Sequence, residues 1–274
     1  MIYKRLFIAT LVLLFIVGCS KENINLVPNS NENTIISKNH VVAHRGAWKK
    51  NSLPQNSIAS LKEAIRLECK GSEFDIVLTA DDSLVISHDR KYNNLEIQKN
   101  KYADLITLKL SNGEKLPTLR EYILAGKENN RTTKLICELK NYGLDTERAK
   151  FLVSSTEKII NELNAQKYII YISFDYNILK QLRMLNSSAN IQYLNGDLPP
   201  EQLKLDNISG ADYGYYVYKD HFEWIAKAKA YKLNLGVWTV NDSENMDWFL
   251  GNDFDFITTD EPEILLSKSK MPTE

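Results

Sequence analysis

The chain has 274 residues, a formal charge of -1 and 43% hydrophobic residues, which is the composition of an ordinary globular protein. This length is sufficient for one large α/β domain with a well-buried core. Near neutrality argues against a nucleic acid as partner, because binding to a phosphate backbone requires an excess of Lys and Arg. The sequence therefore predicts one folded domain, and only the segment before His40 departs from this composition.

Residues 1–19 have the features of an export signal. Two basic residues precede the apolar run 6–18, which is shorter than the about 20 residues of a membrane-spanning helix. Cys19 follows a small residue, an arrangement that resembles the lipobox of bacterial lipoproteins. We predict that Cys19 is lipidated and anchors the protein to the membrane of the cell envelope, with a plain signal peptide or N-terminal anchor as the alternative. Because Ser20 rather than aspartate follows, the resemblance favours the outer membrane.

Residues 20–39 are rich in asparagine and contain few large apolar side chains. Such a composition predicts a flexible tether without a fold of its own. The folded domain then covers residues 40–270, and His40 is interpreted as a linker residue. Cys69 and Cys137 lie at the end of an expected helix and inside an apolar strand. Two cysteines make no disulfide framework, so we expect both to be buried free thiols.

The first strand and helix of the domain are expected between residues 41 and 71. The apolar run 41–43 ends in His44 and Arg45, as a buried parallel strand delivers polar side chains to its carboxyl end. Residues 57–69 have apolar side chains at helical spacing, with Asn56 or Ser57 as N-cap and Gly71 just beyond the end.

Residues 72–79 read as the second strand, and they carry an acidic pair. Glu73 and Asp75 are two positions apart, so both carboxylates lie on one face of the strand. Two carboxylates this close repel each other unless a proton or a cation lies between them, which favours a hard divalent metal. A further short strand, 84–87, ends in His88, and catalytic groups of barrel enzymes lie at such strand ends.

The strand expected over residues 134–140 carries a second charged pair. Glu138 and Lys140 share one face of this apolar segment. Burying an unpaired glutamate is costly, so the two side chains either pair with each other or belong to a site. Before this strand, residues 90–115 read as a polar, loop-like insertion packed by leucines. Thr118 and Glu121 form a capping-box pattern at the start of the next helix.

Beyond residue 140, strands and helices alternate regularly. Helices are expected over 146–165, 175–185, a short stretch from 199, 220–232, 242–250 and 261–267, and strands over 168–174, 191–194, 211–218, 235–240 and 254–259. Together with the strands that start near residues 41, 72 and 135, this alternation predicts a (β/α)8 TIM barrel. An open doubly wound sheet is the alternative, but the sequence has no Gly-rich dinucleotide fingerprint.

The motifs resemble those of the glycerophosphodiester phosphodiesterase family, which has an HRG turn, a Pro-Glu-Asn-Ser/Thr loop, an E-x-D strand, an HD turn and an E-x-K strand. The chain carries, in this order, His44-Arg45-Gly46, Pro54-Gln55-Asn56-Ser57, Glu73-x-Asp75, His88-Asp89 and Glu138-x-Lys140. The resemblance extends over roughly residues 40–266. One departure is Gln55, which stands where the family usually has glutamate; this residue is not among the expected metal ligands.

The resemblance implies a barrel enzyme that hydrolyses small glycerophosphodiesters to sn-glycerol 3-phosphate and an alcohol, and it implies no protein partner. Its metal ligands would be Glu73, Asp75 and Glu138, and oxygen-only ligation favours Ca²⁺ or Mg²⁺. The acid–base pair would be His44 and His88, since the usual histidine pKa near 6.5 suits both roles. Cationic contacts to the phosphate would come from Arg45 and Lys140, and Trp238 would form the floor of the glycerol pocket.

Several alternatives remain open from sequence. Either histidine can be the acid, and the attacking group is water or a glycerol hydroxyl that forms a cyclic phosphate. The tyrosines at 213, 215, 216 and 218 either line the mouth of the site or pack in the core. Two other functions are a phospholipase that acts on intact lipid and a non-catalytic surface lipoprotein that binds phosphoglycerol compounds. The complete set of histidines and carboxylates argues against the second.

Overall fold

The structure, a computed structural model, describes residues 37–269. In this range eight parallel strands form a closed barrel, because the first strand pairs with both the second and the last. The barrel strands, in order around the sheet, are β1 (Val41–Ala43), β2 (Gly71–Leu78), β6 (Lys134–Leu139), β7 (Ile169–Ser173), β8 (Ile191–Tyr193), β9 (Gly210–Gly214), β10 (Asn234–Trp238) and β11 (Phe256–Thr259). The predicted (β/α)8 fold is confirmed.

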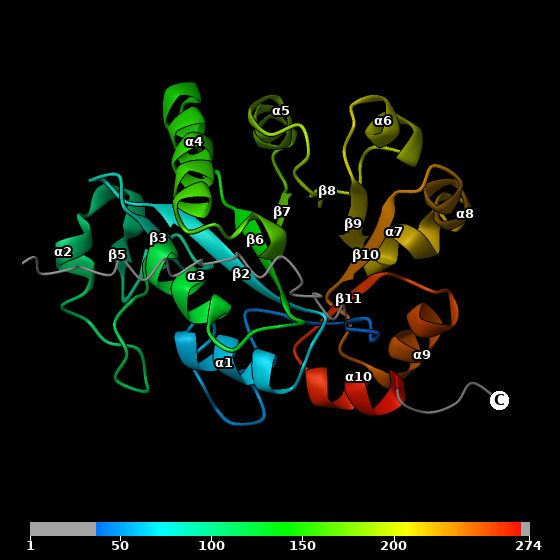
Figure 1. Ribbon diagram of the computed structural model, residues 1–274, viewed down its shortest axis with the longest axis horizontal. Helices are drawn as coiled ribbons and strands as arrows, with labels where there is room; N and C mark the ends of the chain where they lie inside the picture. The colour runs from blue at the N-terminus through cyan, green and yellow to red at the C-terminus, as the bar shows by residue number, and fades with distance from the viewer. Residues whose placement is uncertain (1–36, 270–274) are drawn as a thin grey trace, which may run out of the picture. The chain divides into compact units, whose positions relative to one another are not determined.

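Helices surround the strands (Figure 1). They are α1 (Ile58–Arg66), α3 (Leu119–Lys127), α4 (Thr146–Glu162), α5 (Tyr176–Leu185), α6 (Pro200–Leu205), α7 (Tyr215–Asp220), α8 (Glu223–Ala230), α9 (Ser243–Gly251) and α10 (Pro262–Ser269). The main hydrophobic core lies between strands and helices, and a smaller one fills the barrel interior. Strand alternation explains the division, since Leu135 and Cys137 face the helices while Ile136 belongs to the interior cluster.

Several predicted helix starts are confirmed. Thr118 and Glu121 form a reciprocal capping box at α3, and Ser57 caps α1 with Ser60 as its partner. The aspartates at 145, 175 and 242 cap α4, α5 and α9 through backbone N–H groups of the first turn. Cys69 and Cys137 are buried free thiols, as expected.

Gly71 does not end α1, contrary to the prediction. Glu68, with φ of 56°, adopts the left-handed conformation after this helix, and Gly71 begins β2. A Cβ atom on Gly71 would lie 2.6 Å from Cδ1 of Ile136, a contact too close for two carbon atoms. Glycine is therefore needed here for close packing inside the barrel and not for the turn.

The strand predicted over residues 211–218 is too long. β9 ends at Gly214, and Tyr215 begins α7. The helical turn buries Val217 and Tyr218, whose hydroxyl donates to the Ala211 carbonyl at 2.7 Å, and leaves Tyr215 exposed. Asp220 is accordingly the last residue of α7 and does not cap α8.

The insertion after β3 (Leu84–Ile86) is more ordered than predicted. β3 is antiparallel to β2, and short elements follow it: β4 (Lys91–Tyr92), β5 (Leu95–Glu96), η1 (Ile97–Lys99) and α2 (Tyr102–Leu105). The leucines of this insertion pack with Val77 and Val85 in a separate cluster. The remaining short element is η2 (Gln166–Tyr168).

His40 is not a linker residue. Its Nδ1 lies 2.5 Å from the Phe254 carbonyl oxygen, and its own carbonyl accepts from the Ile257 N–H at 2.7 Å. The predicted signal peptide, Cys19 and residues 20–36 of the predicted tether lie outside the described residues. Within residues 37–269, no helix combines the length and apolar character needed to cross a bilayer.

Candidate active site

A small cavity of about 140 Å³ opens at the carboxyl ends of the barrel strands. Its lining includes seven of the predicted site residues: His44, Arg45, Glu73, His88, Glu138, Lys140 and Trp238. The eighth, Asp75, lies behind them and is 1% exposed. Residues that are far apart in the sequence meet here because consecutive strands of a barrel end at the same face.

The three predicted carboxylate ligands form one buried cluster. Glu73 and Asp75 face inward from β2, and Asp75 is in register with Glu138 of the adjacent β6. One oxygen atom from each of these residues lies within 4.8 Å of the other two. All three residues are buried, so water screens their mutual repulsion poorly.

Lys140 is the cation closest to this cluster. Its Nζ lies 2.7 Å from Glu138 Oε1 and 2.9 Å from Asp75 Oδ1. Burial opposes ionisation of Asp75, but Lys140 and His88 outweigh it and hold the pKa of Asp75 below its usual value. Burial, followed by the charge of Asp75, raises the pKa of Glu138 to about 8 and that of Glu73 well above its usual value. One ammonium thus leaves the three carboxylates under-compensated.

The cluster fits a divalent metal ion. Carboxylate oxygens are the donors that hard cations prefer, and an ion among Glu73, Asp75 and Glu138 would offset both the burial of their charges and the repulsion that together raise the pKa values of the two glutamates. These three residues would hold the ion, as predicted from sequence.

His44 occupies a tight turn after β1. Arg45 has φ of 56° and its N–H donates to Glu73 Oε2 at 2.9 Å, which ties the turn to the carboxylate cluster. Gly46 has φ of 82°, and a Cβ atom there would lie 2.4 Å from Ser60 Oγ, so only glycine fits. The turn places Nε2 of His44 4.0 Å from Glu73 Oε2.

A carboxylate orients the His44 ring from the other side. Nδ1 lies 2.8 Å from Asp260 Oδ1, and Asp260 in turn accepts a hydrogen bond from the Asn241 amide at 2.7 Å. Burial opposes ionisation of Asp260, but its contact with His44 outweighs burial and keeps the pKa of Asp260 below its usual value. An ionised Asp260 favours the proton on Nδ1, so that Nε2 is the ring nitrogen on the cavity side.

His88 reaches the same cavity from the turn after β3. Its Nδ1 lies 2.9 Å from Asp89 Oδ1, and its carbonyl accepts from the Tyr142 hydroxyl. Burial lowers the pKa of His88, although Asp75 and Asp89 act in the opposite direction. A neutral imidazole is therefore favoured at neutral pH.

Gln55, where the chain departs from the family pattern, binds Arg45. Its Oε1 accepts from Arg45 Nη1 at 2.7 Å, and Nε of the same guanidinium lies 3.8 Å from Asp75 Oδ2. A neutral amide thus occupies the position of the family glutamate, so the charge of Arg45 is not neutralised by this partner.

Trp238 forms part of an aromatic wall. Its ring lies edge-on to Phe174 with centroids 5.4 Å apart, and its Nε1 donates to the Asp212 carbonyl at 2.8 Å. Of the tyrosines proposed for the mouth, Tyr213 and Tyr218 are buried in the core.

Sequence reasoning missed three polar residues at this site. Asn56 is predicted from sequence as a helix cap and as part of the family's loop motif but not as a site residue, yet its amide donates to Asp75 Oδ2 at 2.8 Å. Asp260 directly follows the strand end at Thr259, which is the signal that identified His44. Asp212 lies inside the short strand β9, lines the cavity and is 4% exposed. A charged residue within a buried strand was also the signal for Glu138.

The fold and site define the class of the protein: a (β/α)8 barrel with a buried carboxylate cluster and two histidines at the carboxyl ends of its strands. Residues 44–264 match the sequence model of the glycerophosphoryl diester phosphodiesterase family. The chain belongs to this family, whose members are metal-dependent phosphoric diester hydrolases.

Individual relatives agree with this assignment. A glycerophosphodiester phosphodiesterase of Caldanaerobacter subterraneus subsp. tengcongensis is 26% identical over 84% of this chain and 97% of its own length. The crystal structure of a glycerophosphodiester phosphodiesterase from Parabacteroides distasonis is 39% identical, with a TM-score of 0.80 over 86% of this chain and all (100%) of that chain. An Oleispira antarctica phosphodiesterase, solved with its product sn-glycerol-3-phosphate, shares the fold at 22% identity, with a TM-score of 0.74 over 83% of this chain and 95% of that chain.

Proposed function

We propose that the protein hydrolyses glycerophosphodiesters to sn-glycerol 3-phosphate and an alcohol, with Ca²⁺ or Mg²⁺ as its metal ion. The observation that carries the proposal is the convergence of Glu73, Asp75 and Glu138 with His44 and His88 on one small cavity. The names of the relatives and the product bound to the Oleispira antarctica protein support the same substrate class.

The metal ion, held by the three carboxylates, would neutralise charge on the phosphoryl oxygens and lower the pKa of the attacking hydroxyl. Arg45 and Lys140 bring two further positive charges to the cavity and would contact the phosphate. Because Gln55 is neutral, it does not offset the charge of Arg45, whose nearby carboxylate is Asp75, 3.8 Å from Nε.

His44 and His88 form the proposed acid–base pair. Both side chains line the cavity, and each has its Nδ1 beside an aspartate, so that Nε2 is the nitrogen available to substrate. One ring accepts a proton from the attacking hydroxyl and the other donates a proton to the leaving alkoxide. Trp238 and Phe174 would pack against the carbon atoms of the glycerol.

We also propose that a lipid on Cys19 attaches the protein to the outer membrane. This proposal rests on the sequence around the cysteine. The intact mass of the mature protein tests it. If Cys19 is lipidated, the mature protein should begin at Cys19 and carry acyl chains, whereas a Cys19→Ser variant should keep its leader.

The enzymatic proposal is tested with the full chain in mild detergent. Glycerophosphocholine and glycerophosphoethanolamine are supplied with a chelator, and then with Ca²⁺ or Mg²⁺ restored, while sn-glycerol 3-phosphate is measured. We expect chelator-sensitive release that falls by at least about 100-fold in Glu73→Gln, because an ion that stabilises the transition state contributes several kcal/mol. Glu147→Gln, which changes an exposed carboxylate paired with Lys150, is the matched control.

Release that is insensitive to both chelator and Glu73→Gln would refute the metal-dependent mechanism. Absence of release from every diester, with metal still bound to Glu73, Asp75 and Glu138, would instead favour an intact-lipid substrate or a binding protein.

A further inference from the structure

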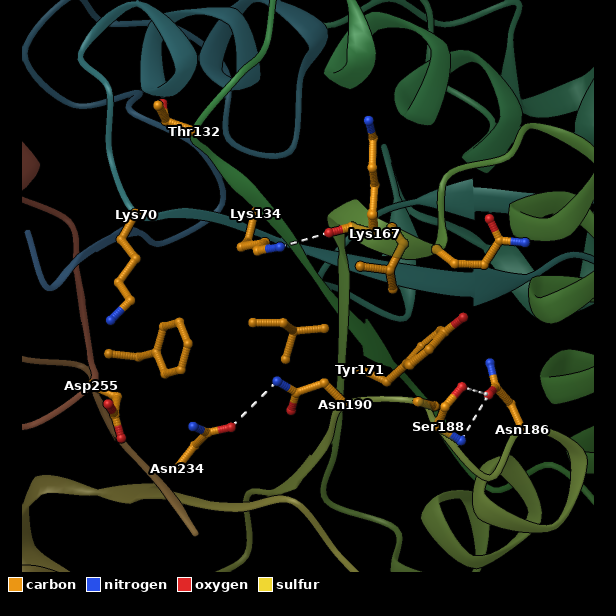
Figure 2. A pocket seen from close by; sticks show the side chains of 15 residues that line it. Lys70, Thr132, Lys134, Lys167, Tyr171, Asn186, Ser188, Asn190, Asn234 and Asp255 are labelled. Carbon is orange, nitrogen blue, oxygen red and sulfur yellow. Dashed lines mark hydrogen bonds between the residues drawn. The ribbon is translucent and has the colours of Figure 1, made fainter. Parts of the chain in front are cut away.

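A second and larger hollow, of about 500 Å³, lies at the end of the barrel opposite the catalytic cavity. Figure 2 shows the side chains that line it. Several of its residues stand immediately before the barrel strands or at their first positions, whereas the carboxylate cluster lies toward the strands' carboxyl ends. Lys70 precedes β2, Lys134 begins β6, Asn190 precedes β8, Asn234 begins β10 and Asp255 precedes β11. The volume is within the range of about 300–1,000 Å³ that small-molecule sites occupy.

The lysine side chains of this hollow outnumber its carboxylates, so its lining carries a net positive charge. Within residues 37–269, no carboxylate oxygen lies within 4.0 Å of the ammonium of Lys70 or Lys134. Lys70 Nζ instead lies 4.6 Å from the centroid of the Phe256 ring, and Lys134 Nζ donates to the Lys167 carbonyl at 2.6 Å (Figure 2). Asp255 is the carboxylate among the lining residues, and its Oδ2 accepts from the Leu235 N–H at 2.9 Å.

Burial makes these two lysine charges costly. It lowers the pKa of Lys70 despite the opposing charges of Asp255 and Asp253. Burial also lowers the pKa of Lys134, and the neighbouring charge of Lys167 acts in the same direction. The nearby carboxylates therefore do not compensate the two ammonium groups, and an anion in the hollow would do so.

Neutral donors and an apolar floor complete the hollow. Asn190 Nδ2 donates to Asn234 Oδ1 at 3.3 Å, which leaves Asn234 Nδ2 without an acceptor in the described part of the chain. Phe256, Ile169 and Ile170 contribute buried apolar surface to the lining. Lysine and amide N–H groups suit an oxyanion, because a lysine ammonium donates hydrogen bonds and accepts none.

We propose that this hollow binds a phosphate dianion, either free phosphate or a small phosphomonoester, through Lys70 and Lys134. Asn234 supplies an amide donor to the same group, and the organic part of a monoester packs against Phe256. The site is separate from the catalytic cavity, and it goes beyond the proposed hydrolysis because no carboxylate cluster or histidine takes part in it.

The first test is titration of the full chain with inorganic phosphate by isothermal calorimetry, in detergent and chelator so that metal at the catalytic cavity does not contribute. We expect saturable binding with a Kd of about 1 mM or tighter. The double variant Lys70→Gln/Lys134→Gln should weaken it at least about ten-fold, since two charge-assisted contacts are lost. The matched control, Lys62→Gln/Lys158→Gln, removes the same charge from exposed positions and should leave Kd unchanged.

Titration with phenyl phosphate distinguishes a site for free phosphate from a site for a phosphomonoester. Tighter binding of phenyl phosphate than of inorganic phosphate, lost in the same double variant, identifies a monoester site with an apolar contact. Equal affinities identify a phosphate site.

Two controls keep the test decisive. Should the double variant fail to fold, the single variants Lys70→Gln and Lys134→Gln take its place, and each should raise Kd. Lys70→Arg/Lys134→Arg keeps both charges and should retain binding. No saturable binding to the parent protein, or an unchanged Kd in the glutamine variants, overturns the proposal.

Discussion

Asp212 offers a prediction that depends on the barrel interior alone. The residue is 4% exposed, and among residues 37–269 its Oδ1 has no hydrogen-bond partner. A Cβ atom on Gly236 would lie 2.5 Å from the carboxyl carbon, so the side chain fits only because glycine faces it. Burial raises the pKa of Asp212 to about 7. Asp212→Asn should therefore stabilise the protein increasingly as the pH rises.

The sign and size of the effect follow from linkage between folding and proton binding. The unfolded chain releases this proton near its ordinary pKa of 3.8, while the folded protein keeps it until about pH 7. Below pH 3.8 the carboxyl group is protonated in both states and does not reduce the unfolding free energy. Between pH 3.8 and about 7 the unfolding free energy falls, and above about pH 7 it stays at the lower value. At about 1.4 kcal/mol for each pH unit, the loss reaches an upper limit of roughly 4 kcal/mol. About two-thirds of it, roughly 3 kcal/mol, arises between about pH 5 and pH 8.

The assay is urea unfolding of parent and Asp212→Asn at pH 5 and pH 8, both in chelator. The asparagine amide is also buried without a partner, which costs roughly 1–3 kcal/mol at either pH. The quantity to compare is therefore the difference in unfolding free energy between Asp212→Asn and the parent protein. This difference should shift in favour of the variant from pH 5 to pH 8. Asp104→Asn, at an exposed position, is the control. A difference that is the same at both pH values would refute the reasoning.

Other predictions concern the site and its turn. His44→Ala and His88→Ala should each lower kcat by about 10²–10⁴-fold with a natural diester. A p-nitrophenyl leaving group needs no proton, so it should restore the activity of the variant that lacks the general acid but not of the variant that lacks the base. The two variants will therefore differ on this substrate. Gly46→Ala should lower the unfolding free energy by more than about 1 kcal/mol in chemical denaturation. In Gly113→Ala, with φ of 86°, the new Cβ has no atom of residues 37–269 within 4 Å apart from its chain neighbours. This variant should therefore lose less stability, and equal losses would contradict the steric argument. Glu138→Gln should raise Tm in chelator and reduce the further rise caused by added Ca²⁺ or Mg²⁺; a lower Tm in chelator would contradict the repulsion inferred here.

Much of the site could be predicted because strands impose a strict alternation. Glu73 and Asp75 had to share a face, and Glu138 had to face inward if its apolar neighbours faced the helices. The barrel follows from the same pattern, and with it the meeting of distant strand ends at one cavity.

Other features depend on tertiary contacts that have no local signal. The tyrosines after Gly214 have a composition suited to a strand, but the buried hydrogen bond from Tyr218 to Ala211 favours a helical turn. Spacing along the chain also does not show that Asp260 orients His44, because 216 positions separate them. The hollow around Lys70 and Lys134 combines single residues from strand starts, where no sequence repeat marks a site.

The charges inside the barrel indicate that its interior serves binding at the expense of stability. Glu73, Asp75 and Glu138 face one buried ammonium, and burial, followed by the repulsion among the carboxylates, raises the pKa values of the two glutamates. Asp212 adds a fourth buried carboxyl group with no cation among the causes of its pKa shift. Since a metal ion that binds only the folded protein stabilises it by RT ln(1 + [M]/Kd), the repulsion lost on binding contributes directly to metal affinity. The metal-free barrel is thus strained electrostatically at the place where the ion would bind.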